Sequence, residues 1–210
     1  MTIRLLSLNP ARWQRSEAYA HQVASRTVQS RSYYRDRDYY ENYAGGVRLL
    51  RETAVSRGLE VKTALIGGPG DSYEELKLLA DHFPQLQLVH AADWHWPNIN
   101  GLKERLTEHA AELGGLEIAL HFADLLQPFG VADGSLDLIY TNKLFDLYAR
   151  DFSSTGTLLL RLFGMLRDGG MLYSFDYPLP GEKCYFDEFA QTLGFTKAAS
   201  RIYIKPFLNG

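Results

Sequence analysis

Residues 61–83 read VKTALIGGPGDSYEELKLLADHF, and this stretch decides the fold. Its first seven residues, VKTALIG, are a short run typical of a buried strand, and the run ends in a turn rich in glycine. The residues that follow, 72–83, place Leu76, Leu79 and Ala80 on one face of a helix. The stretch is therefore predicted to form a strand, a glycine turn and a helix.

The same alternation of strand and helix continues along the chain. Further strands are predicted at 86–93, 116–122, 136–142, 170–177 and 201–206, and further helices at Asn98–Leu113, Thr155–Leu166 and Cys184–Leu193. Strands that alternate with helices at this spacing pair in parallel through right-handed crossovers. The predicted architecture is an α/β fold, a three-layer sandwich with a mainly parallel, doubly wound sheet. After residue 177, one helix and one strand are expected.

The part before this alternation is predicted to be helical. Residues 1–59 are too short for an independent domain, so we expect them to form an N-terminal helical cap or lid on the unit formed by residues 60–210. A first helix is predicted at 10–30. A lid over the carboxyl edge of the sheet would cover a ligand there.

A second helix is predicted to begin at Asp38, with Glu41 three residues later completing a capping box. It is expected to end near Gly58. The pair Gly45–Gly46 inside it costs about 2 kcal/mol relative to two alanines. This cost predicts either a bend in the helix or a close approach of another group to its backbone.

Composition excludes several classes of protein. With 210 residues, 46% of them hydrophobic and 22% charged, the chain is neither disordered nor fibrous. No apolar run is long enough to cross a membrane and the start does not resemble a signal peptide, so a cytoplasmic protein is expected. The single cysteine, Cys184, excludes an intrachain disulfide, and the histidines lack metal-ligand spacing. We expect no intrinsic metal, and the sequence leaves a homodimer open.

Charge is distributed unevenly along the chain. Residues 1–60 hold ten arginines, no lysine and six acidic residues, whereas residues 61–210 hold twelve basic and nineteen acidic residues. A basic segment of this kind suggests nucleic acid as a partner, but no recognised nucleic-acid-binding motif accompanies it. A solvated helical face explains the arginines more simply, and nucleic-acid binding is not expected.

The ends of the predicted strands hold the candidate binding residues, because doubly wound sheets bind ligands beyond the carboxyl ends of their strands. The turn containing Gly67, Gly68 and Gly70 lets a ligand approach the backbone, and the next helix offers free N–H groups. Asp93 ends the following strand, where a carboxylate can accept hydrogen bonds from both hydroxyls of a ribose. Each has a structural alternative: a tight turn for the glycines, and a helix cap or loop acid for Asp93.

A longer segment resembles a known family. Residues 121–142, HFADLLQPFGVADGSLDLIYTN, contain an acid after the third predicted strand and the sequence DGSLDL leading into the fourth. Residues 158–177, LLLRLFGMLRDGGMLYSFDY, follow as a helix, a glycine-containing turn and a strand. In this order, the chain is similar to the class I S-adenosylmethionine-dependent methyltransferases over roughly residues 60–205.

The resemblance implies a Rossmann-like domain with S-adenosylmethionine as its cofactor. It places the three glycines of the turn near the methionine part of the cofactor and Asp93 at the ribose. Trp94 is expected beside the adenine, with Asp124 and Leu125 at the adenine edge. Thr141 completes the expected cofactor-binding set.

The implied activity is methylation of a small-molecule acceptor at oxygen, nitrogen or a carboxylate. Because the sulfonium is already activated, the protein mainly aligns the reactants and excludes water. Asp146 is the candidate base, with a tyrosine from the amino-terminal helices as another, and Asp146 has a solvated loop acid as its structural alternative. Tyrosines supply flat apolar contact and arginine pairs with carboxylate or phosphate. The acceptor-binding candidates are Tyr33, Tyr34, Tyr39, Arg35 and Asn142.

Two departures from the family pattern favour a different class of function. The glycine turn is compressed, and the loop after the fourth predicted strand has Phe145 and Asp146 where many family members have histidine. A protein with this fold that binds a ligand or a partner without transferring methyl groups is therefore the alternative.

Overall fold

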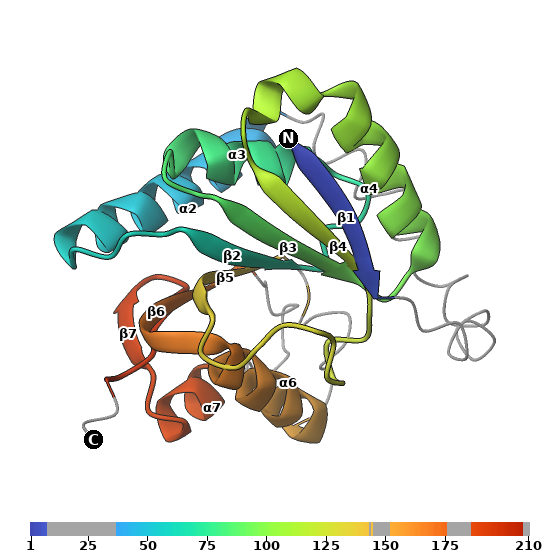
Figure 1. The fold of residues 1–210 in the computed structure, drawn as a ribbon. Coiled ribbons are helices and arrows are strands. Elements are labelled where there is room, and N and C mark those ends of the chain that lie inside the picture. The colour runs from blue at the N-terminus through green and yellow to red at the C-terminus, as the bar shows by residue number, and fades with distance from the viewer. Residues whose placement is uncertain (8–36, 143, 145–151, 176–185, 208–210) are drawn as a thin grey trace.

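The computed structural model describes residues 1–7, 37–142, 144, 152–175 and 186–207 (Figure 1). Within them, eight strands form one sheet in the order β1-β4-β3-β2-β5-β6-β8-β7. The strands from β1 to β6 pair in parallel, and β8 is antiparallel to both of its neighbours. The strands are β1 (Thr2–Ser7), β2 (Thr63–Gly67), β3 (Leu88–Asp93), β4 (Glu117–Phe122), β5 (Leu136–Asn142), β6 (Leu166–Phe175), β7 (Thr196–Ala199) and β8 (Ile202–Ile204).

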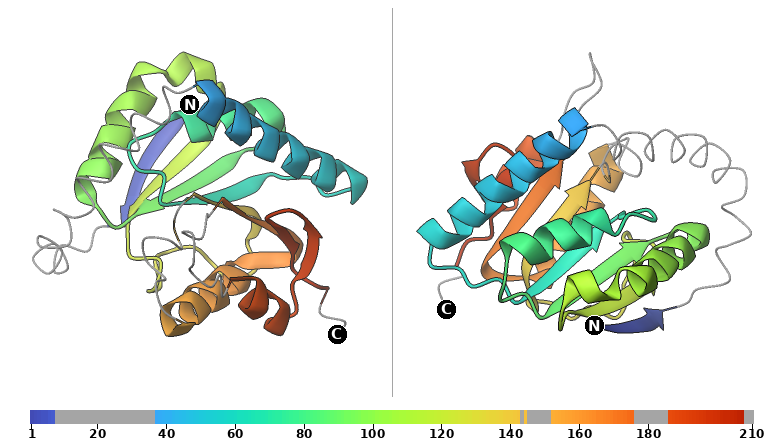
Figure 2. Two further views of the ribbon diagram at one scale, coloured as in Figure 1. Left: turned by 180° about the vertical axis from the view of Figure 1, so that it is seen from behind. Right: turned by 90° about the horizontal axis from the view of Figure 1, so that it is seen from above.

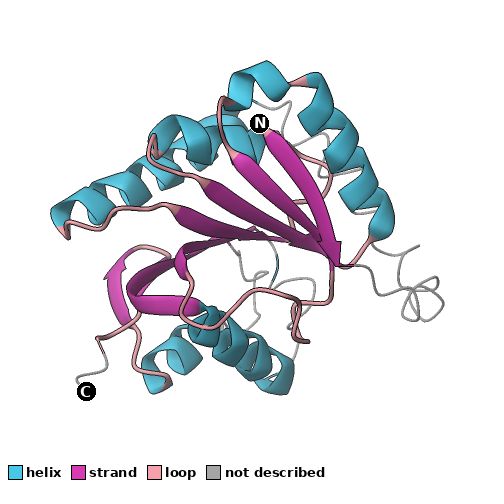
Figure 3. Cartoon of the chain, in the orientation of Figure 1, coloured by secondary structure: helices cyan, strands magenta, loops and turns pink. Residues whose placement is uncertain are grey.

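Helices cover both faces of this sheet, as Figures 2 and 3 show. One layer contains α2 (Arg37–Ser56), α3 (Glu74–His82) and α4 (Trp96–Glu108), which is followed by the short 3-10 helix η2 (Ala110–Leu113). The opposite layer contains α6 (Phe152–Met165) and α7 (Phe186–Thr192). Each layer has its own buried hydrophobic core against the sheet. The prediction of an α/β sandwich around a mainly parallel sheet is confirmed.

Helix α2 is built into the first of these cores. Val47, Leu50 and Ala54 are spaced to lie on one face of the helix, and all three are buried. They belong to the same core as Tyr140 of β5 and Tyr173 of β6. The stretches before and after the predicted boundary at residue 59 therefore contribute to one core.

The glycine pair of α2 allows a close contact with the sheet. A β-carbon on Gly46 would overlap the hydroxyl group of Tyr173, whereas the same position on Gly45 faces open space. The close approach predicted for this pair is confirmed at Gly46. Alanine, the better helix former, does not fit there without displacement of the tyrosine.

The first residues of the chain join the sheet. Thr2–Ser7 form β1, which pairs in parallel with β4, so that Thr2 lies opposite Glu117. The prediction that residues 1–59 form only helices was therefore wrong for Thr2–Ser7. This short apolar run forms an edge strand, which needs a neighbouring strand on one side only. The predicted lid comprised residues 1–59. Of these, Arg37–Ser56 form α2, which packs on one face of the sheet, and the helix predicted at 10–30 lies outside the described residues.

The carboxyl-terminal part contains one strand more than predicted. β7 and β8 form an antiparallel pair, and Arg201 between them has a φ of 65°. β8 inserts between β6 and β7, which completes the sheet. The prediction missed β7 because its sequence, TKAA, lacks the alternation of apolar and polar residues.

No helix among the described residues is long and apolar enough to cross a membrane.

Candidate functional site

The carboxyl ends of β2, β3 and β5 meet at one edge of the sheet. β2 lies between the other two, and Gly67 at its end pairs with Ala92 of β3 and with Thr141 of β5. The chain leaves β2 toward β3 and later returns to the other side of β2 as β5. This is a topological switch point, the place where doubly wound sheets bind ligands. The structure therefore brings together the glycine turn, Asp93 and Thr141.

The glycine turn has a backbone conformation that glycine adopts readily. Gly68 and Gly70 have φ angles of 71° and 62°, in the left-handed region. The Gly68 N–H donates to a carbonyl of β3 at 2.9 Å. A β-carbon on Gly67 would lie 3.1 Å from side-chain carbons of both Leu125 and Leu144. The turn is thus held by β3 on one side and packed by leucines from the segments after β4 and β5.

Asp93 places a buried carboxylate beside this turn, with only 5% of the residue exposed. Its Oδ1 accepts the His95 N–H at 2.8 Å, and its Oδ2 accepts the Asn98 side-chain amide at 3.1 Å and the Gly70 N–H at 3.2 Å. Burial raises the pKa of the Asp93 carboxyl above its usual range, while these hydrogen bonds act in the opposite sense. One carboxylate therefore ties the glycine turn to the first turn of α4.

The bond to His95 gives Asp93 a helix-capping role, because His95 is the N-cap residue of α4 and its own side chain makes no capping bond. The structural alternative for Asp93 is thus observed. It does not exclude a ligand, since a carboxylate has about four acceptor sites and the described residues occupy three of them.

The predicted adenine-edge residues follow β3 and β4 at the same edge. Asp124 accepts the Leu126 N–H at 2.8 Å, which closes a tight turn. Leu125 is buried and contacts the glycine turn, whereas Trp94 is half-buried, with its ring centroid 5.9 Å from that of His95. These residues lie on segments that follow β3 and β4, at the same edge of the sheet as Asp93.

The structure describes some of the remaining predicted site residues and not others. Thr141 is fully buried, and its hydroxyl donates to the Tyr173 carbonyl at 3.4 Å, which joins β5 to β6 beside the glycine turn. Tyr39 lies in the first turn of α2 and Asn142 is the last residue of β5. The other candidates lie outside the described residues: Asp146, Tyr33, Tyr34 and Arg35.

Sequence reasoning missed Asn98 and Leu144 as members of this site. Asn98 was predicted only as the beginning of a helix, yet its amide bonds the Asp93 carboxylate. A signal for Asn98 was present in the sequence: it is a polar residue in the first turn of a helix that directly follows an acid at the end of a strand. Leu144 carried no such signal, because its contact with Gly67 depends on how the segment after β5 packs.

A histidine pair lies on the neighbouring strands β3 and β4. His90 Nδ1 and His121 Nε2 are 2.9 Å apart, and the His121 ring meets Phe129 edge-on, 5.3 Å between centroids. Burial, with His90 as the second cause, lowers the pKa of His121 to about 4. The pair is therefore neutral near pH 7. Among the described residues, no group of three or more His, Cys, Asp or Glu side chains is arranged to hold a metal ion.

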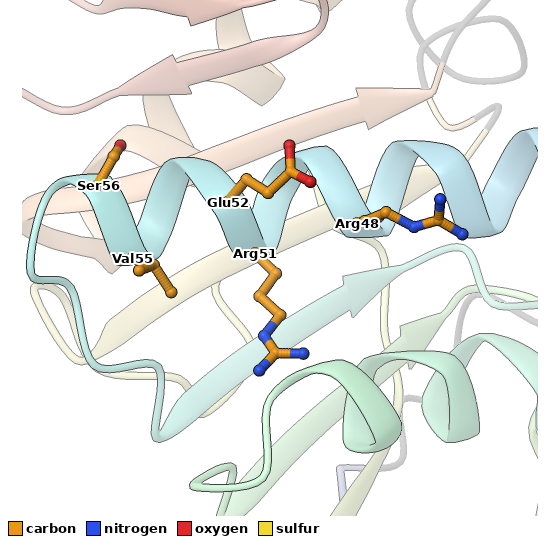
Figure 4. A pocket seen from close by; sticks show the side chains of 5 residues that line it. All are labelled: Arg48, Arg51, Glu52, Val55 and Ser56. Carbon is orange, nitrogen blue, oxygen red and sulfur yellow. The ribbon is translucent and has the colours of Figure 1, made fainter.

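Cavities are also found away from this edge. One, of about 350 Å³, lies along α2 and is lined by Arg48, Arg51, Glu52, Val55 and Ser56 (Figure 4). A second, of about 340 Å³, lies between residues 58–61 and 82–85, which precede β2 and β3. Both are lined by residues distant from the carboxyl ends of the strands, and neither includes a predicted site residue.

The sheet order, the glycine turn and the acid ending the next strand define the class of fold, that of the class I S-adenosylmethionine-dependent methyltransferases. A crystal structure of the plantazolicin methyltransferase BpumL with a monoazolic desmethylPZN analog and SAH has a TM-score of 0.56 at 15% identity, covering 76% of this chain and 55% of that one. For DesVI of Streptomyces venezuelae the TM-score is 0.52 at 14% identity, covering 68% and 54%.

Phosphoethanolamine N-methyltransferase 2 of Haemonchus contortus, in complex with S-adenosyl-L-methionine, has a TM-score of 0.50 at 16% identity, covering 65% of this chain and 34% of that one. The chain thus spans between 34% and 55% of the length of these three structures. At such identities the likeness shows the fold alone. No protein-family model and no curated protein sequence matches the chain.

Proposed function

We propose that this chain is an S-adenosylmethionine-dependent methyltransferase that acts on a small-molecule acceptor. The observation that carries the proposal is the buried carboxylate of Asp93, bonded to the glycine turn at the switch point of the sheet. Solved structures with this fold include one in complex with SAH and one in complex with S-adenosyl-L-methionine. Their likeness to this chain supports the proposal at the level of fold.

The residues at the switch point fit this cofactor. Asp93 retains one acceptor site on Oδ1 for a ribose hydroxyl, and the buried surroundings strengthen such a bond. Trp94 and Leu125 supply flat and apolar surface for an adenine, with Asp124 at its edge, and the turn of Gly67, Gly68 and Gly70 with Thr141 beside it would receive the methionine part. When bound, the cofactor supplies a methyl group activated by the sulfonium.

The residues of the chain then have to orient the acceptor and exclude water. A hydroxyl or protonated amine needs a base, for which we propose Asp146, whereas a carboxylate acceptor needs none. Tyr33, Tyr34 and Tyr39 would cover the acceptor as a lid, with Arg35 pairing with an anionic group and Asn142 donating or accepting a hydrogen bond. A cytoplasmic location and a homodimer belong to the same proposal.

Calorimetry with S-adenosylmethionine and S-adenosylhomocysteine tests the cofactor assignment. We expect both to bind the wild-type protein and Asp93→Ala to weaken both, because the substitution removes the ribose acceptor. Asp133→Ala, an exposed acid before β5, is the matched control and should bind normally. Absence of binding to the wild type at millimolar concentration contradicts the proposal. Labelled S-adenosylmethionine with a panel of small-molecule acceptors then identifies the nucleophile.

A second candidate is a methyltransferase-like protein that binds a ligand or partner without methyl transfer. The contact that favours it is the packing of the Leu125 and Leu144 side chains against Gly67. These side chains take up space near the turn that the methionine part would use. Cofactor binding without turnover on any acceptor in the panel supports this candidate, whereas labelled product excludes it.

A further inference from the structure

Asn98 is a buried polar residue of α4 that contacts the candidate cofactor site through Asp93. It is 8% exposed and is the third residue of α4, and its side-chain amide donates to Asp93 Oδ2. Gly101, one helical turn later on the same face of α4, lies against the glycine turn: a β-carbon there would be 3.1 Å from Asp71 Cβ. The beginning of α4 therefore supports both the acid and the turn.

The hydrogen bonds distinguish the two oxygens of Asp93. Oδ2 accepts from Asn98 and from Gly70, which uses both of its acceptor sites. Oδ1 accepts only the His95 N–H among the described residues, so one site remains on it. A ligand hydroxyl that approaches Asp93 without displacing a protein donor must therefore bond Oδ1.

We propose that Asn98 is a positioning residue for the cofactor: by occupying Asp93 Oδ2 it fixes the orientation of the carboxylate and leaves Oδ1 as the oxygen that accepts one ribose hydroxyl. This inference rests on the proposed function, because it assumes that the ligand carries a ribose. It goes beyond that function because it assigns one hydrogen bond, from one ribose hydroxyl to Asp93 Oδ1. A carboxylate without the Asn98 donor could accept hydrogen bonds from both hydroxyls.

The charge of Asp93 depends on these donors. Burial favours the neutral form of a carboxyl group, and each hydrogen bond to the carboxylate opposes that effect. A positive charge on His95, at the start of α4, would act on the Asp93 pKa in the same sense as the donors. Asp71 on the glycine turn and Asp124 after β4 are the acids on the flanking segments. Loss of the Asn98 amide should therefore make Asp93 take up a proton at higher pH.

The test measures S-adenosylhomocysteine affinity by calorimetry between pH 5.5 and 8.5, with thermal unfolding of each ligand-free variant recorded alongside. Asn98→Ala should weaken binding about tenfold at pH 7.5, and the decline in affinity on acidification should begin at higher pH than in the wild type. Asn100→Ala is the matched control, since this exposed asparagine of the same helix bonds Glu104 instead of Asp93. It should bind as the wild type does.

Asn98→Asp keeps the shape of the side chain and changes the sign of the pH effect. Near pH 8 two carboxylates face each other and binding should be weaker than in Asn98→Ala. As the pH falls, the pair shares one proton, the donor to Asp93 returns, and affinity should rise where that of the wild type falls. A purely structural role for Asn98 does not produce this inversion.

The 2′-deoxy and 3′-deoxy analogues of S-adenosylhomocysteine test the single bond to Oδ1. One of them should bind wild type as tightly as the parent compound, and the other about tenfold more weakly. Equal loss with both analogues, or a pH profile unchanged in Asn98→Ala and in Asn98→Asp, overturns the role of Asn98 and leaves the proposed function standing. Absence of binding by the wild type overturns both.

Discussion

Asp137 shows how one residue of a family-like sequence stabilises the fold at a distance from the site. Its Oδ2 accepts the N–H groups of Lys62 and Thr63, each at 2.8 Å, and its Oδ1 accepts a hydrogen bond from Arg167. These bonds lie at the amino-terminal ends of β2, β5 and β6, opposite the candidate site. The carboxylate thereby satisfies donors at the start of β2 that the sheet leaves free.

We predict that Asp137→Ala lowers the free energy of unfolding by about 2–4 kcal/mol, because two backbone donors lose their acceptor and Arg167 loses its partner. Urea denaturation measures the change. Asp133→Ala, four residues earlier and exposed, should stay within about 0.5 kcal/mol of the wild type. Equal stability of the two variants contradicts the role of Asp137.

His121 makes stability depend on pH in a defined window. Its pKa is about 4 in the folded chain, below the usual value of about 6.5 that it regains on unfolding. Between these values the unfolded chain binds a proton that the folded chain does not, so stability is lost as the pH falls. We expect His121 to account for a loss of about 2–3 kcal/mol between pH 7 and pH 4.

Urea denaturation at pH 7, 5.5 and 4.5 measures this loss, with His121→Gln as the comparison because glutamine does not titrate. The variant is expected to be less stable at pH 7 and to lose less stability on acidification. A decline as steep as that of the wild type shows that other groups cause the pH dependence.

At the scale of elements, α2 can lie this close to Tyr173 of β6 only because Gly46 has no β-carbon. Gly46→Ala gains about 1 kcal/mol in helix propensity and loses more to overlap with the Tyr173 hydroxyl, so we predict net destabilisation of about 1–2 kcal/mol. Gly45→Ala, its neighbour in open space, should stabilise by up to about 1 kcal/mol.

A double-mutant cycle with Tyr173→Phe locates the cause of the Gly46→Ala effect. Removal of the hydroxyl relieves part of the overlap, so the cost of Gly46→Ala should be smaller in the Tyr173→Phe background. The free energies of unfolding of the four proteins settle this. Strictly additive costs contradict the proposed contact.

Elements that bury a face were predictable from sequence, and elements at the edge of the sheet were not. β2 to β5 read as strands because their apolar runs lie between helices or turns, whereas β1 and β7 have one neighbour each and weak patterns. The glycine turn and Asp93 were predictable because strand ends hold ligands in this class of fold. His90 and His121 were not, because their hydrogen bond joins two strands whose proximity only the folded chain creates.

At the scale of the whole molecule, the proposed acceptor lid and the proposed cofactor site at the switch point can be tested separately. We predict that the combined change Tyr33→Ala, Tyr34→Ala and Arg35→Ala lowers kcat/KM for the acceptor at least tenfold while S-adenosylhomocysteine affinity stays within about threefold. The reason is that the proposed lid would contact the acceptor, whereas the switch point would hold the cofactor.

Turnover with labelled cofactor and calorimetry on the same preparations separate the two effects. Arg48→Ala on the exposed surface of α2 serves as the control for loss of a positive charge. Undiminished turnover in the triple variant means that residues 33–35 do not act as an acceptor lid.

The pairing of β1 with β4 has a consequence for the newborn chain. Thr2 pairs with Glu117, which at common rates of translation is made on the order of ten seconds after it. Closing so long a loop is entropically costly, which slows this step of folding. In the interval Leu5 and Leu6, still 37% and 53% exposed in the finished molecule, form part of an unpaired apolar strand. β1 can therefore pair only after β4 has been made, and until then its unpaired edge is open to pairing with other chains.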